Sequence, residues 1–81
     1  MIVRVKLFAI ARQLTGVETV AVELPDGGTV GELRAALASQ YSSLAPMMRL
    51  MMVAVDTDYA SDETIIRADA EVALIPPVSG G

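Results

Sequence analysis

The chain of 81 residues contains no histidine, cysteine or tryptophan. A serine–histidine triad, a cysteine nucleophile, a histidine general base, a Cys/His zinc site and a disulfide are therefore excluded for this chain alone. Without disulfides or a metal, the fold has to be held by burial of apolar side chains. These absences predict one small domain that is not catalytic by itself.

Basic residues and long apolar segments are also scarce. Six Lys and Arg face ten Asp and Glu, the formal net charge is −4, and Lys6 is the only lysine, so a surface that neutralises nucleic-acid phosphates is not expected. The longest apolar run, residues 50–55, is far shorter than the ~20 residues that span a bilayer, and no cleavable signal pattern precedes it. We expect a cytoplasmic protein with no nucleic-acid or membrane partner.

Apolar residues, in contrast, make up 53% of the chain. A chain this short leaves much of its surface exposed after folding, so part of the apolar surplus is expected on the outside. Contiguous apolar surface of this kind usually marks an interaction site. The composition therefore predicts a patch that faces a protein partner.

Hydrophobic periodicity in the first half predicts two strands and a helix. Residues 2–8 and 17–24 alternate apolar and polar side chains, as half-buried strands do, and residues 9–15 predict one or two helical turns that end at Gly16. Thr29 and Glu32 have the spacing of a capping box, which predicts a helix start. The stripe that this helix would bury consists of Val30, Leu33, Ala36, Leu37 and Tyr41.

The second half predicts the rest of the sheet. Residues 52–56, a short piece around Tyr59 and residues 71–75 indicate strands, and the last is apolar enough to be expected in the centre, buried on both faces. Ile65 and Ile66 are expected to fill the core. The order predicts an α+β domain over residues 1–75, a mixed sheet of four to five strands with one main helix on one face. The opposite face stays uncovered and matches the apolar surplus.

Three other groups of residues are weaker candidates for sites. Gly27 and Gly28 precede a helix and could hold a phosphate, but no phosphate-binding motif is present and an ordinary turn explains them better. Four acidic residues could bind a hard cation, although their spacing is not that of a calcium loop and solvated turns are the better interpretation. Four methionines fit core filling and a binding rim equally well. The acidic residues are Asp56, Asp58, Asp62 and Glu63, and the methionines are Met47, Met48, Met51 and Met52.

The chain ends in a distinctive sequence, from Pro76 and Pro77 through Val78 and Ser79 to Gly80 and Gly81. The two prolines end strand pairing, and residues 76–81 form a flexible tail that can reach up to ~20 Å. Glycines can pass through a channel too narrow for other residues and bring the terminal carboxylate to a buried site on a partner. Activation to an acyl-adenylate would make that carboxylate open to attack by sulfur, whereas the alternative is an inert terminus.

This sequence resembles the small subunit of molybdopterin synthase over almost its whole length. The tail, residues 76–81, is the specific part of the resemblance, and the other matching residues are weak alone. They are Phe8, Ala9, Arg12, Leu14, Gly16, Thr29, Val30, Leu33, Arg34, Glu71, Val72 and Ala73. Asp56 and the pair Asp69 and Ala70 depart from the family pattern, where Asn and a Gly-Asp turn are usual, and the departures bear on local turns.

The resemblance implies a ubiquitin-like β-grasp fold and a sulfur-carrier function. It implies that an adenylating enzyme activates Gly81 with ATP, that a sulfur donor converts it to a thiocarboxylate, and that sulfur passes to precursor Z to form the molybdopterin dithiolene. Residues 76–80 would enter the pocket of a large subunit, in a heterotetramer, with Phe8 and Ile75 at the interface. No cofactor or metal would be bound by this chain.

Two alternatives stay open. A sulfur carrier for thiazole synthesis or transfer RNA thiolation would share the Gly-Gly end and its chemistry, although the diproline and the residues around Phe8 favour the molybdopterin branch. A β-grasp interaction module with inert glycines is the other alternative. That alternative predicts that loss of Gly81 is harmless, whereas a carrier would lose all function.

Overall fold

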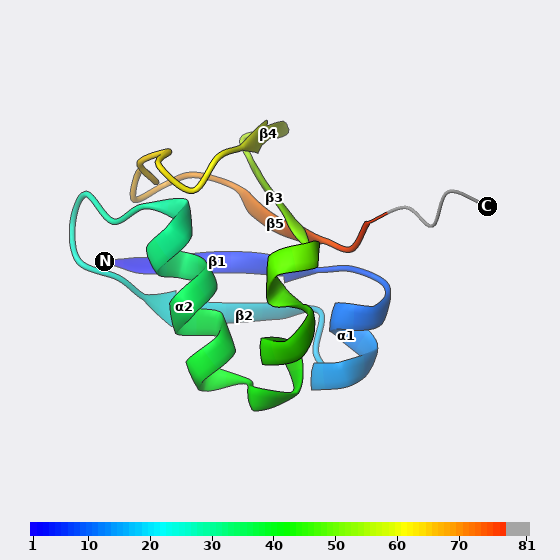
Figure 1. The fold of residues 1–81 in the computed structure, drawn as a ribbon. Helices are drawn as coiled ribbons and strands as arrows, with labels where there is room; N and C mark the ends of the chain where they lie inside the picture. The colour runs from blue at the N-terminus through cyan, green and yellow to red at the C-terminus, as the bar shows by residue number, and fades with distance from the viewer. Residues whose placement is uncertain (78–81) are drawn as a thin grey trace.

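The computed structural model describes residues 1–77, and these form a sheet with helices on one side. Figure 1 shows the main helix, α2, lying across β1 and β2, with the short helix α1 at the end where β1 and β5 finish. In chain order the elements are β1 (Ile2–Leu7), α1 (Ile10–Thr15), β2 (Thr19–Glu23), α2 (Val30–Gln40), the 3₁₀ segment η1 (Ser42–Leu50), β3 (Met52–Val55), β4 (Asp58–Ala60) and β5 (Val72–Ile75). The α+β prediction is confirmed.

The sheet has five strands in the order β2-β1-β5-β3-β4. β5 pairs in parallel with β1, with Val5 opposite Val72, and antiparallel with β3, with Met52 opposite Ile75. The β1–β2 and β3–β4 pairs are antiparallel hairpins. The last strand therefore lies in the centre of the sheet, as predicted, and the chain leaves the sheet from the middle.

The core lies between α2 and one face of the sheet. Alternation in β1 buries Val3, Val5 and Leu7, and the predicted stripe of α2 buries Val30, Leu33 and Leu37 against the strands. The capping box that starts α2 is also confirmed. The Thr29 hydroxyl accepts from the Glu32 N–H at 3.2 Å, and the Glu32 carboxylate accepts from the Thr29 N–H at 3.1 Å, so two of the free amides at the helix start are satisfied.

Two sequence expectations need correction. β5 is buried on one face only, because Ala73 and Ile75 are half-buried on the side that no helix covers. Ile66 fills the core at 1% exposure, but Ile65 is 62% exposed, since the bridge to Thr29 sends neighbouring side chains to opposite sides. After α2 ends at Gln40, the chain continues as η1, which contains Pro46.

No helix within residues 1–77 combines the length and the apolar character needed to cross a membrane. The predicted tail begins at Pro76, which is half-buried, and Pro77, which is exposed. Its other residues, Val78, Ser79, Gly80 and Gly81, lie outside the described residues.

Candidate functional site

The chain leaves the sheet at Ile75, between β1 and β3. Leu74 pairs with Leu7 of β1 and Ile75 pairs with Met52 of β3. Pro76 and Pro77 follow, and a proline cannot donate a hydrogen bond to continue either pairing. The point at which the tail starts is therefore fixed by both neighbouring strands and lies next to their side chains.

An apolar surface surrounds this point on the uncovered face of the sheet. We define the exit surface as Phe8, Met52 and Ile75. Met52 and Ile75 are direct cross-strand partners, and Phe8 comes one residue after Leu7, the partner of Leu74. Phe8 is 46% exposed and Met52 is 42% exposed. Large apolar side chains gathered in this way are typical of a protein-binding surface.

Two of these residues, Phe8 and Ile75, are those that the sequence assigns to a partner interface. The structure places them on adjacent strands, on the same face and beside the start of the tail. Their role in binding stays a prediction. Sequence reasoning missed Met52 as the third member, because its position opposite Ile75 depends on the register of β3.

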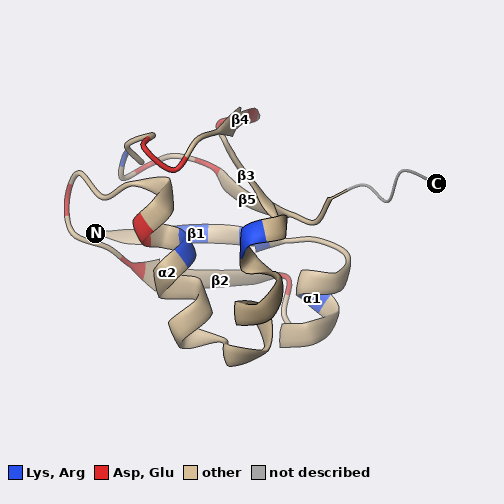
Figure 2. Cartoon of the chain, in the orientation of Figure 1, with Lys and Arg blue, Asp and Glu red and all other residues tan. Residues whose placement is uncertain are grey.

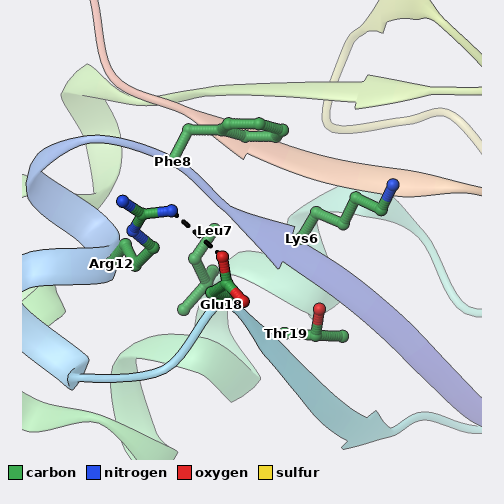
Figure 3. Close-up of a pocket in the computed structure, with 6 residues that line it drawn as sticks. All are labelled: Lys6, Leu7, Phe8, Arg12, Glu18 and Thr19. Atoms are coloured by element: carbon green, nitrogen blue, oxygen red, sulfur yellow. Dashed lines mark hydrogen bonds and ion pairs between the residues drawn. The ribbon is translucent and has the colours of Figure 1, made fainter.

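A small hollow of about 270 Å³ adjoins the exit surface at the ends of β1 and β2. Figure 3 shows the Phe8 ring and the Lys6 side chain on the same side of β1, with Arg12 reaching to Glu18. The Arg12 Nη1 to Glu18 Oε1 distance is 3.1 Å, and both side chains are more than half exposed. Such an exposed ion pair contributes little to stability.

Acidic residues are distributed unevenly over the molecule. Figure 2 shows them on the loop before α2, at the start of α2, at both ends of β2, and on the segments around β4 and the loop that leads to β5. From Leu33 to Val55, and again from Val72 to Pro77, the chain contains none. The strands β3 and β5 and the two prolines at the tail exit therefore carry no carboxylate, and Glu18 in the adjoining hollow is paired with Arg12.

Two of the four acidic residues considered as cation ligands have other contacts. Asp56 accepts a hydrogen bond from the Glu71 N–H at 2.9 Å, and Asp62 binds Arg34 at 2.8 Å. Within residues 1–77, no three candidate ligand side chains come close enough to hold a metal ion. The methionines divide between both interpretations, because Met48 and Met51 are buried in the core and Met52 lies on the exit surface.

Arg34 is a structural residue that the sequence analysis did not identify. Its Nε donates to Asp62 Oδ1 at 2.8 Å, and its Nη1 donates to the carbonyls of Met48 at 2.8 Å and Met51 at 2.7 Å. Arg34 therefore connects α2 to the end of η1 and to the loop before β5. Residues so far apart in the chain leave no local sequence signal of this contact.

The mixed sheet with one main helix across a single face, and with a central last strand that ends beside an apolar surface, defines a ubiquitin-like β-grasp protein. Comparison with family models narrows this class. The model of the ThiS family matches residues 5–81. This chain belongs to the ThiS family.

Individual relatives agree with this assignment. The molybdopterin synthase sulfur carrier subunit of Arabidopsis thaliana is 35% identical over 79 residues, which cover 98% of this chain and 82% of that protein. The crystal structure of SAMP1 from Haloferax volcanii superposes with a TM-score of 0.85 at 30% identity and full coverage of both chains. A solved complex of subunits 1 and 2 of molybdopterin-converting factor from Helicobacter pylori 26695 contains a chain with a TM-score of 0.70 and full coverage of both chains. Its 22% identity shows the fold alone.

Proposed function

We propose that this chain is the sulfur-carrier subunit of a molybdopterin synthase, with the carboxylate of Gly81 as its reactive group. An adenylating enzyme joins this carboxylate to the AMP part of ATP and releases pyrophosphate. Hydrosulfide supplied by a donor protein then attacks the activated carbonyl carbon, displaces AMP and leaves a thiocarboxylate. Two thiocarboxylated carriers in turn each give one sulfur to precursor Z in the large subunit and are released as carboxylates, and the two sulfurs form the dithiolene.

The observation that carries this proposal is the position at which the tail begins. The chain leaves a central strand through Pro76 and Pro77, beside the exposed Phe8 and Met52. A partner that binds the exit surface is thereby placed over the start of a tail that ends in two glycines. Family membership and the relative of the same function support the assignment.

Division of labour between the subunits follows from the residues of this chain. With no histidine or cysteine, it has no general base near neutral pH and no thiol to carry sulfur. The proposal therefore gives ATP binding to the adenylating enzyme and catalysis to the large subunit. In a heterotetramer of two small and two large subunits, each carrier docks through Phe8 and Ile75, and residues 76–81 enter the large subunit's pocket.

The experiment that tests the chemistry is intact-mass analysis after incubation with the adenylating enzyme, ATP and the sulfur donor. We expect the mass increment of one oxygen replaced by sulfur, located by fragmentation at Gly81. A chain that lacks Gly81 is the matched control and should stay unchanged. An unmodified full chain under conditions that activate a known carrier would contradict the proposal.

A second step separates the alternatives. The thiocarboxylated chain is mixed with the large subunit and precursor Z, and formation of the dithiolene is followed. Sulfur transfer supports the molybdopterin branch. A chain that becomes thiocarboxylated but gives no transfer belongs to thiazole synthesis or transfer RNA thiolation. A chain that keeps its cellular function without Gly81 is an interaction module.

A further inference from the structure

Three residues other than glycine have a positive φ within residues 1–77: Ala9 at 51°, Asp56 at 51° and Thr57 at 73°. Asp56 and Thr57 form the two-residue turn between β3 and β4, where positive φ at both positions matches the twist of a hairpin. Ala9 is a different case. Its ψ is −122°, which places it at the first central position of a type II′ turn, where glycine is normally required.

The neighbours of Ala9 hold it in this conformation. On one side, the Leu7 N–H donates to the Glu18 carbonyl at 2.8 Å and the Leu7 side chain is buried. On the other side, Ala11 is completely buried and its N–H donates to the Phe8 carbonyl at 3.1 Å, which closes the turn. Only Phe8 and Ala9 lie between the end of β1 and the start of α1. The backbone strain at Ala9 is therefore imposed by anchors on both sides.

Phe8 depends on this turn for its direction. Nearly half of its side chain is exposed, so packing within the chain holds the ring only in part. Its backbone, in contrast, is fixed by the strand pairing before it and by the closed turn after it. The direction in which the ring leaves β1 toward the exit surface is thus set by the backbone at residues 8 and 9.

We propose that Ala9 is a positioning residue for partner binding, which presents Phe8 in its docking orientation at the expense of fold stability. This inference rests on the proposed function, in which Phe8 contacts the large subunit. A methyl group at position 9 restricts φ and ψ far more than glycine does. A ring that is already oriented loses less conformational entropy when the partner binds.

The first test is Ala9→Gly, with thermal unfolding and calorimetric binding to the molybdopterin synthase large subunit of the source organism. Glycine relieves the strain, so the Tm should rise by about 4 °C. It also gives the backbone beside Phe8 more conformational freedom, so the Kd should rise about two- to five-fold. If Ala9 affected stability alone, Ala9→Gly would change the Tm and leave the Kd at its wild-type value.

Two control variants distinguish the relief of backbone strain from a gain in backbone conformational freedom. Ala9→D-Ala, in a chemically synthesised chain, suits a positive φ without adding backbone freedom, and should raise the Tm while the Kd stays at the wild-type value. Thr57→Gly relieves positive-φ strain at the opposite end of β3 from Met52. It should raise the Tm and leave the Kd unchanged.

Each result supports or overturns the inference. The inference is overturned if Ala9→Gly binds with the wild-type Kd. It is also overturned if the Kd rises equally in Ala9→Gly and Ala9→D-Ala, since the loss of affinity would then come from changed contacts. Phe8→Ala distinguishes this failure from failure of the proposed function. If Phe8→Ala weakens binding and Ala9→Gly does not, only the positioning role is lost. If the wild-type chain itself does not bind, the proposed function is overturned as well.

Discussion

The same strands form both faces of the sheet, but one face packs against the core and the other remains uncovered. Leu74 points to the covered face and is completely buried, whereas its neighbour Ile75 points to the uncovered face and remains partly exposed. The same alternation separates buried Leu7, the last residue of β1, from exposed Phe8, which follows it. One register therefore buries core side chains on one face and leaves on the other the surface at which we propose that the partner binds, so that this surface can change without rebuilding the core.

The largest loss of stability is expected from Leu74→Ala, which removes a buried side chain from the covered face. Removal of a fully buried leucine side chain leaves a cavity and should cost about 2–5 kcal/mol, a large part of the ~4–12 kcal/mol expected for a domain of this size. Urea unfolding followed by circular dichroism measures the loss. Ile75→Ala, the neighbouring change on the other face, is the control and should cost less than half as much. Equal losses would show that the two faces do not differ in stability.

A smaller loss of stability is expected from Arg34→Ala, which removes the hydrogen bonds that connect α2 to the end of η1 and to the loop before β5. The change removes the bond to Asp62 and the arginine donor of the Met48 and Met51 carbonyls, of which Met48 keeps its bond from the Met51 N–H. Because Arg34 is only 19% exposed, those carbonyls are poorly placed to recover water, and the expected cost is about 2 kcal/mol. Equilibrium unfolding is again the measurement. Arg49→Ala, an exposed arginine of η1, should cost less than ~0.5 kcal/mol, and a similar loss in both variants would contradict the role of Arg34.

Local sequence patterns predict most of the covered face. Alternation identifies β1 and β2, the capping box identifies the first turn of α2, and three- and four-residue spacing identifies the helix stripe. These signals suffice because each is contained within one element. The 3₁₀ segment η1 shows the limit, because the contacts of Leu44 and Met48 with the core hold it and no signal within the segment predicts those contacts.

The binding side is less predictable because its features depend on register between distant segments. Phe8 and Ile75 could be selected from the sequence, since one ends an alternating strand and the other precedes the diproline. Met52 could not, because its place opposite Ile75 needs the pairing of β3 with β5. The strained backbone of Ala9 has no signal either, since alanine ordinarily favours helices. Residues 78–81, the remaining part of the predicted site, lie outside the described structure.

The smallest change in free energy is expected from Ile75→Lys, which alters the uncovered face and leaves the core intact. A lysine at the centre of the exit surface places a charge among Phe8 and Met52, and should weaken binding of the large subunit at least about tenfold, or ~1.4 kcal/mol. Unfolding stability should change by less than ~0.5 kcal/mol, because the lysine ammonium can reach water. Isothermal titration calorimetry measures the affinity.

Ala21→Lys is the matched control for this change, because Ala21 lies opposite Arg4 on the same face, on the edge strand β2 and away from the exit surface. It adds the same charge and should leave the Kd within about twofold, as for a change outside the contact area. Equal weakening by both variants would mean that overall charge governs binding. Unaltered complex formation by Ile75→Lys would remove the exit surface from the interface, and the comparison between the two faces would then no longer separate stability from binding.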